Sequence, residues 1–201
     1  MSRRWKTDFK SEKSRTARNL AHNEELCKSL IQGLFSGQGN EPVRSMRYGK
    51  HTMAHCGCEA IAVYNIMQLL GLEQPLYRVI TEFELNGLSM LFFSTFFGAS
   101  PKKLGRYFTA HGVDFTYIKK REEFIKTAQN RPFGIAAFWV NTYSKHRFNR
   151  FGSGMHTVAF TKAEDGTISV FNRYNGDTQP RIYKNLEELL DDRKFISGYV
   201  F

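Results

Sequence analysis

The sequence is poor in cysteine and proline. Its 201 residues include three cysteines and five prolines. An odd number of cysteines in a chain of this size does not indicate a disulfide framework, and Cys56 and Cys58 are too close for an ordinary bridge to each other. We therefore expect a reducing compartment, and the cytoplasm is the simplest one.

The sequence also lacks a long apolar run. The basic N-terminus, residues 1–10, is not followed by the apolar region that a signal peptide needs. The most apolar stretch, residues 88–99, is too short to cross a bilayer and contains serine and threonine. We interpret it as a core helix and predict no transmembrane segment.

The charge is strongly basic, with a formal net charge of +10. Residues 1–50 carry 11 Lys and Arg against 5 Asp and Glu, so more than half of the excess lies in the first quarter. Such a balance is compatible with an anionic surface as a partner, but a basic surface that only aids solubility is the simpler interpretation. No nucleic-acid signature is present, and the glycine-rich residues 33–39 lack the Lys-Ser/Thr of a phosphate-binding loop.

Hydrophobic spacing divides the chain into an extension and one domain. Leucine and isoleucine recur at helical spacing over residues 14–35, and residues 1–12 are predicted to be frayed. A polar link with glycine and proline follows at 36–50. We predict a basic helical extension over residues 1–40 and a single domain over residues 41–201.

Helices are expected in the first half of that domain and strands in the second. A helix that is apolar nearly all round is predicted from Cys58 to Leu70, ended by Gly71 and buried inside the domain. The other expected helices are 75–83, 88–98, 101–111, 121–129 and 185–192, and the expected strands are 133–140, 155–162, 167–174, 181–183 and 195–201. This segregation indicates an α+β fold in which the central helix packs on an antiparallel sheet.

Three residues in this framework could perform nucleophilic catalysis. Cys58 opens the buried helix, where the helix dipole and free backbone N–H groups favour the thiolate. His156 begins a predicted strand and could serve as the base. Asn172 lies on the next strand, where its side-chain amide oxygen could accept a hydrogen bond from the imidazole and orient it.

The motifs around these residues resemble the papain-like cysteine peptidases. The match is nearest to the peptidases that process bacteriocins with double-glycine leaders, and to related bacterial proteins. That family carries Gly-Cys before a helix of small residues ending in Leu-Gly, here Gly57-Cys58 to Leu70-Gly71, and Gly-x-His-x-Val, here Gly154 to Val158. The resemblance covers roughly residues 45–178. It implies a papain-like fold and a thiol protease with a Cys58, His156 and Asn172 triad and no cofactor.

Two departures from the family pattern leave alternatives open. Cys56-Gly57 also fits the family's nucleophile, so Cys56 is an alternative to Cys58. The family also places an oxyanion-hole glutamine a few residues before the nucleophile, whereas the last one here, Gln38, is too far away. His51 or Thr52 is the candidate substitute donor, and without one the chain would be a weak enzyme or a pseudoenzyme.

A zinc site is a competing interpretation of the same segment. His51, His55, Cys56 and Cys58 have suitable ligand types, but their spacings are not those of the usual structural zinc sites. We therefore predict no metal.

The sequence predicts a cysteine peptidase or related thiol acyl-transfer hydrolase that acts on a peptide or protein substrate. The alternative is a catalytically inactive papain-like fold that binds a peptide or a partner protein. The pattern predicts neither the identity of the substrate nor the oligomeric state.

Overall fold

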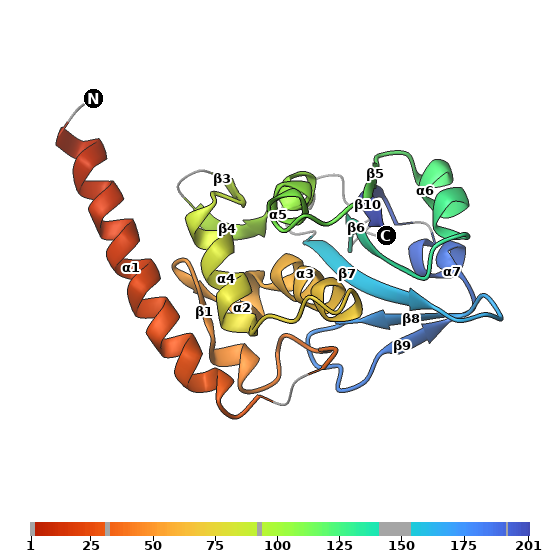
Figure 1. Ribbon diagram of the computed structural model, residues 1–201, viewed down its shortest axis with the longest axis horizontal. Coiled ribbons are helices and arrows are strands. Elements are labelled where there is room, and N and C mark those ends of the chain that lie inside the picture. Colours follow the sequence, from red (N-terminus) through yellow and green to blue (C-terminus); the bar gives the residue numbers. More distant parts are fainter. Residues whose placement is uncertain (1–2, 31–32, 92–93, 141–153, 192) are drawn as a thin grey trace, which may run out of the picture.

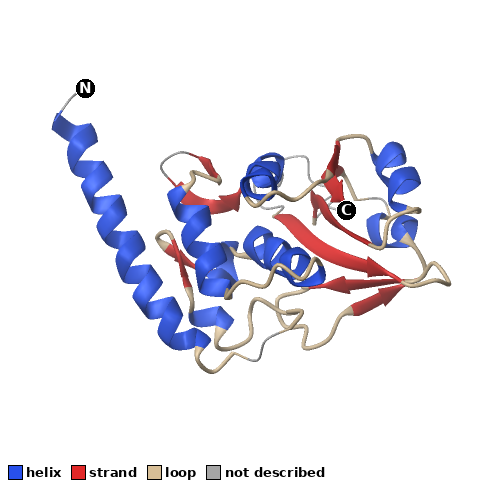
Figure 2. Cartoon of the chain, in the orientation of Figure 1, coloured by secondary structure: helices blue, strands red, loops and turns tan. Residues whose placement is uncertain are grey.

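The computed structural model describes residues 3–30, 33–91, 94–140, 154–191 and 193–201. Figures 1 and 2 show how the elements are arranged. The helices are α1 (Arg3–Cys27), α2 (Met53–Cys56), α3 (Cys58–Leu69), α4 (Leu76–Leu85), α5 (Leu104–Ala110), α6 (Arg121–Ala128) and α7 (Leu186–Leu190), with 3₁₀ turns η1 (Val43–Ser45) and η2 (Pro101–Lys103). The strands are β1 (Arg47–Tyr48), β2 (His51–Thr52), β3 (Ser89–Leu91), β4 (Ser94–Ala99), β5 (Thr116–Ile118), β6 (Phe133–Trp139), β7 (Met155–Lys162), β8 (Ile168–Phe171), β9 (Arg181–Tyr183) and β10 (Phe195–Val200).

Six strands form one antiparallel sheet in the order β5-β10-β6-β7-β8-β9. The expected α+β class is therefore confirmed. The turn at Asp165 and Gly166 joins β7 to β8, as the sequence predicts, and the Asn185 side chain caps α7 by accepting from the Glu188 N–H. Two short hairpins, β1–β2 and β3–β4, lie outside this sheet.

The two faces of the sheet are covered by different helices. On the face that we call the α3 face, Ile135, Ala159 and Tyr199 belong to one core cluster with the buried side of α3. On the opposite face, the α6 face, Phe138, Val158 and Phe160 belong to a second cluster with residues of α6 and α7 (Figure 1). Because successive side chains of a strand point to opposite faces, a residue's position along β7 decides which helix it meets.

Helix α3 is the buried helix that the sequence predicts. Every residue from Cys58 to Met67 is buried, so the helix has no solvent face. Gly57 precedes it where a Cβ atom would lie 2.6 Å from the Met53 carbonyl oxygen, so a larger residue would displace α2. Gly71 follows with φ +69°, a left-handed conformation that glycine adopts without strain and that ends the helix.

Two predicted segments are wrong. The core helix expected over residues 88–99 is not formed, because Ser89–Leu91 is strand β3 and Ser94–Ala99 is strand β4. Because this run is apolar at nearly every position, its periodicity does not separate helix from strand, and its aromatic content favours a strand. Helix α1 runs from Arg3 to Cys27 and therefore includes residues expected to be frayed, while it ends before residue 35.

The later part of α1 docks on the domain through polar side chains. Asn19 Nδ2 donates to the Gly49 carbonyl at 2.9 Å and to Glu84 Oε1 at 2.9 Å. Asn23 Nδ2 donates to the Arg47 carbonyl at 2.8 Å, and Thr16 Oγ1 donates to Glu84 Oε2 at 2.7 Å. The N-terminal end of α1 points away from the domain in Figure 1. Within the described ranges, no helix is both long enough and apolar enough to cross a membrane.

Candidate active site around Cys58 and His156

Cys58 begins α3, as predicted, but its thiol is enclosed. The side chain is 7% exposed, and Sγ donates a hydrogen bond to Glu59 Oε2 at 3.3 Å. Burial raises the pKa of the Cys58 thiol well above its ordinary value; the adjacent Glu59 carboxyl, when ionised, raises it further, and the Thr157 backbone N–H offsets part of this. The structure therefore holds Cys58 as a neutral thiol.

Glu59 contacts both Cys58 and Thr157, and the sequence pattern predicts no role for it. Its carboxyl is completely buried, and Oε1 accepts a hydrogen bond from Thr157 Oγ1 at 3.2 Å. Burial raises the pKa of Glu59 to about 7, despite the opposing hydrogen bonds from Cys58, Thr157 and the Ala99 backbone. The available signal was a carboxylate in the first turn of an otherwise apolar helix, because such a residue is rarely fully buried without partners.

His156 lies on the face of the sheet opposite to Cys58. In the β6–β7 register, His156 pairs with Phe138 and Thr157 pairs with Ala137. Phe138 belongs to the cluster on the α6 face, whereas Thr157 reaches Glu59 on the α3 face. Among the described residues, the thiol of Cys58 forms its hydrogen bond with Glu59 and none with His156. The predicted Cys58–His156 pair is therefore not brought together.

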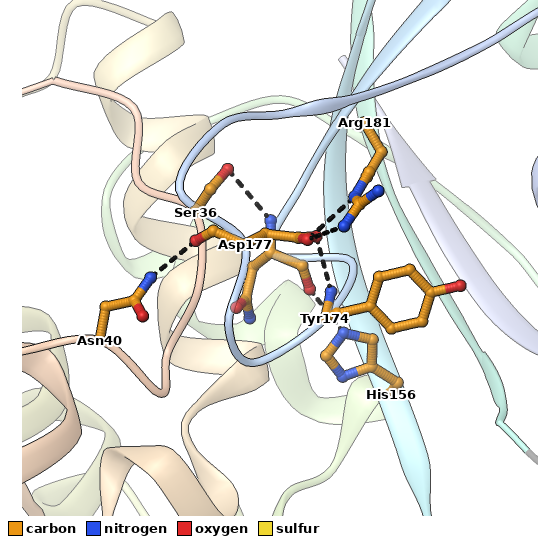
Figure 3. Close-up of polar contacts among 7 residues, drawn as sticks. Ser36, Asn40, His156, Tyr174, Asp177 and Arg181 are labelled. Atoms are coloured by element: carbon orange, nitrogen blue, oxygen red, sulfur yellow. Dashed lines mark hydrogen bonds and ion pairs between the residues drawn. The ribbon is translucent and has the colours of Figure 1, made fainter.

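The imidazole of His156 is oriented by a backbone group. Its Nε2 lies 2.6 Å from the Asn172 carbonyl oxygen, so Nε2 carries the proton and donates it there (Figure 3). Phe138 packs edge-on against the ring, with centroids 6.3 Å apart. Burial lowers the pKa of His156 to about 4, and the Arg173 charge lowers it too, while the Asn172 carbonyl raises it. The ring is therefore neutral at pH 7.

The Asn172 side chain does not orient the imidazole as predicted. Its Oδ1 accepts from the Gln38 backbone N–H at 2.8 Å, and its Nδ2 donates to Gln38 Oε1 at 2.9 Å. Asn172 has a left-handed backbone, with φ +58°, which turns its own carbonyl toward His156. Gln38, set aside because of its distance in sequence, also donates from Nε2 to the Ala54 carbonyl at 3.0 Å. The fold thus uses Gln38 to fix Asn172 and α2.

The alternative nucleophile is also held as a thiol. Cys56 Sγ donates to the Thr52 carbonyl at 3.5 Å, and burial raises the pKa of Cys56 to about 12, with the Glu59 and Glu84 charges adding to this. His51 and Thr52, the proposed oxyanion donors, form the short strand β2 beside β1. The structure pairs β2 with β1 in an antiparallel register that places Thr52 opposite Arg47 and His51 opposite Tyr48.

The zinc interpretation gains no support. The His51 and His55 rings lie side by side, with centroids 5.2 Å apart. Cys58 faces Glu59 instead. Over the described part of the chain, no three His, Cys, Asp or Glu side chains are grouped so that they could hold a metal ion.

Comparison with known proteins assigns no family. No model of a protein family matches the sequence, and no curated protein matches it.

Proposed function

We propose that this chain is a binding protein with a papain-like fold, and that it does not use Cys58 as a nucleophile. A buried helix that begins with a cysteine and packs on an antiparallel sheet supports the papain-like assignment. One observation carries the functional part: Cys58 and His156 lie on opposite faces of the sheet. A peptide or a partner protein is the proposed ligand.

The chemistry of the two groups supports this proposal. Acyl transfer by cysteine needs a thiolate and a base within hydrogen-bond reach. Burial and the Glu59 carboxyl both oppose ionisation of Cys58. His156 already donates from Nε2 to the Asn172 carbonyl. Moving its ring to the α3 face would require β7 to slip by one residue, which would exchange the faces of all its side chains and disrupt both core clusters.

A cysteine peptidase or related acyl-transfer hydrolase is the second candidate. It is favoured by the place of Cys58 at the first residue of α3, a helix of 12 residues, where the helix dipole stabilises an anion. The Thr157 backbone N–H, which lowers the pKa of Cys58, acts in the same direction. In this alternative, Cys58 attacks a carbonyl, and His156 and Asn172 complete the triad.

Thiol alkylation distinguishes the two candidates. We expect iodoacetamide at pH 7.5 to label Cys58 at least about tenfold more slowly than Cys27, because the reactive species is the thiolate and Cys58 is enclosed. Cys27 is a suitable internal reference, since it is partly exposed and lines a surface cavity of about 400 Å³. Mass spectrometry of the native chain, with urea-unfolded chain as the full-labelling standard, measures both rates.

Hydrolysis provides the complementary measurement. Any turnover of peptide or ester probes should be the same in Cys58→Ala, Cys27→Ala and the unaltered chain. Faster labelling of Cys58 than of Cys27, or hydrolysis that disappears only in Cys58→Ala, would establish the peptidase instead.

A further inference from the structure

The α6 face carries a buried cation, Arg173, two of whose polar atoms lack a partner among the described residues. Arg173 follows Asn172 directly and is 2% exposed. Its Nε and Nη1 are enclosed and have no hydrogen-bond partner among the described residues. A buried charged group without partners is costly, and proteins usually pair such groups or bind them to an ion. This arrangement points to a ligand group that the protein itself does not supply.

Two aromatic rings hold the guanidinium in place. Its Cζ lies 5.3 Å from the centroid of Phe138 and 4.4 Å from that of Tyr174. The guanidinium thus makes a cation–π contact with each ring. Its N–H groups lie in the plane and remain available for acceptors at the edge.

The neighbouring charged groups already have partners. Asp177 accepts from Arg181 Nε at 2.9 Å through Oδ1 and from the Tyr174 backbone N–H at 2.9 Å through Oδ2 (Figure 3). Arg193, which also lies over Phe138, donates to the Leu189 carbonyl at 2.8 Å. Within the described ranges, Arg173 therefore differs from Arg181 and Arg193 in having two buried side-chain nitrogens, Nε and Nη1, without a partner.

The surroundings favour an anion over other ligands. The whole chain carries a formal net charge of +10, which attracts anions to any opening. Tyr174, whose ring contacts the guanidinium of Arg173, is 48% exposed, so the site borders solvent on this side.

We propose that Arg173, held between Phe138 and Tyr174, binds an oxyanion group of the ligand, a carboxylate or a phosphate. Arginine is suited to this because its fixed fork of donors matches two oxygens of either group. The inference rests on the proposed binding function, since it names the chemical group that the ligand presents. For a peptide ligand, that group is a terminal or side-chain carboxylate.

The side-chain Nε–H resonance of Arg173 gives a direct test in the full chain. Titration with sodium acetate, and separately with inorganic phosphate, should move this resonance along a saturable curve with a dissociation constant in the millimolar range or tighter. The Arg181 Nε–H resonance is the internal control, because its donor already binds Asp177. Sodium chloride at matched ionic strength should leave both resonances in place.

The substitution Arg173→Lys assigns the resonance and tests the geometry. Lysine keeps the charge but loses the fork, so the saturable shift of the His156 ring signals in acetate or phosphate should disappear. Equal shifts in chloride, no saturation with either anion, or an unchanged response in Arg173→Lys would each overturn the proposal. The relative affinities of acetate and phosphate identify whether the site prefers a carboxylate or a phosphate group. These outcomes are independent of Cys58 alkylation, so failure here and failure of the proposed function are distinguishable.

Discussion

Replacing Asn172 with alanine should lower the free energy of unfolding by about 3–5 kcal/mol, the largest effect that we expect from a single substitution at the site. The side chain is 1% exposed and makes two hydrogen bonds with Gln38. Its removal would leave the Gln38 backbone N–H and side-chain oxygen buried without partners. Alanine would also be strained at φ +58°, where asparagine is tolerated. Urea unfolding followed by circular dichroism measures the change.

Asn172→Gly is the matched control for the backbone strain that alanine would have at this position. Glycine removes the same hydrogen bonds but adopts a positive φ without strain, so it should be about 1–2 kcal/mol less destabilising than alanine. A double-mutant cycle of Asn172→Gly with Gln38→Ala isolates the bond between the two side chains, because the backbone N–H of residue 38 is present in every variant. Equal losses in the alanine and glycine variants, with no coupling to Gln38, would mean that Asn172 is not the anchor of this loop.

The same residue shows why a sequence predicts the fold class more readily than the site. The helical and strand periods predict α3 and β7 closely, because both elements bury an apolar pattern. The pairing of Asn172 with Gln38 spans 134 positions, and nothing in either segment signals it before the chain is folded. The sequence points to the side chain of residue 172, but the group that contacts His156 is its backbone carbonyl.

The sequence also does not determine on which face of the sheet a strand residue lies. His156 and Thr157 are neighbours in sequence, and a shift of one position exchanges the faces to which they point. The alternation along β7 does not by itself tell which face α3 covers, because Val158 and Ala159 are both buried. Only the register against β6, with His156 opposite Phe138, settles which of the two meets the helix. Spacing and chain order alone therefore predicted a dyad that the sheet does not form.

The buried Glu59 and His156 should give opposing contributions to the pH dependence of stability. The pKa of Glu59 is raised from 4.5 to about 7 in the folded chain. Folded Glu59 therefore keeps a proton that the unfolded chain releases, and its contribution to stability falls as the pH rises from 4.5 to 7. The pKa of His156 is lowered from 6.5 to about 4. Unfolded His156 binds a proton that the folded chain excludes, so its contribution rises between pH 4 and 6.5.

Each shift corresponds to roughly 3 kcal/mol, and the two nearly cancel between pH 4.5 and 6.5. The unaltered chain should therefore show little net slope from this pair in that range. The Glu59→Gln variant should show the His156 contribution alone. The free energy of unfolding of this variant should therefore rise by about 3 kcal/mol relative to that of the unaltered chain as the pH increases from 4.5 to 7. The His156→Gln variant keeps a donor for the Asn172 carbonyl. Its free energy of unfolding should fall by a similar amount relative to that of the unaltered chain between pH 4 and 6.5.

Urea unfolding of the three proteins at half-unit steps from pH 4 to 7.5 makes the comparison, and the differences between curves remove the carboxylates that all three share. The result also bears on Cys58, because Oε2 of Glu59 is the acceptor for its thiol. If the Glu59→Gln curve ran parallel to that of the unaltered chain, Glu59 would be ionised throughout and the thiol would lie beside a full negative charge. The expected divergence instead means that Glu59 releases its proton only near pH 7, so below that pH it is a neutral group that cannot accept a proton from Cys58. Below pH 7, Cys58 therefore has no base within reach, because Glu59 is protonated and the neutral imidazole of His156, which could accept a proton, lies on the α6 face.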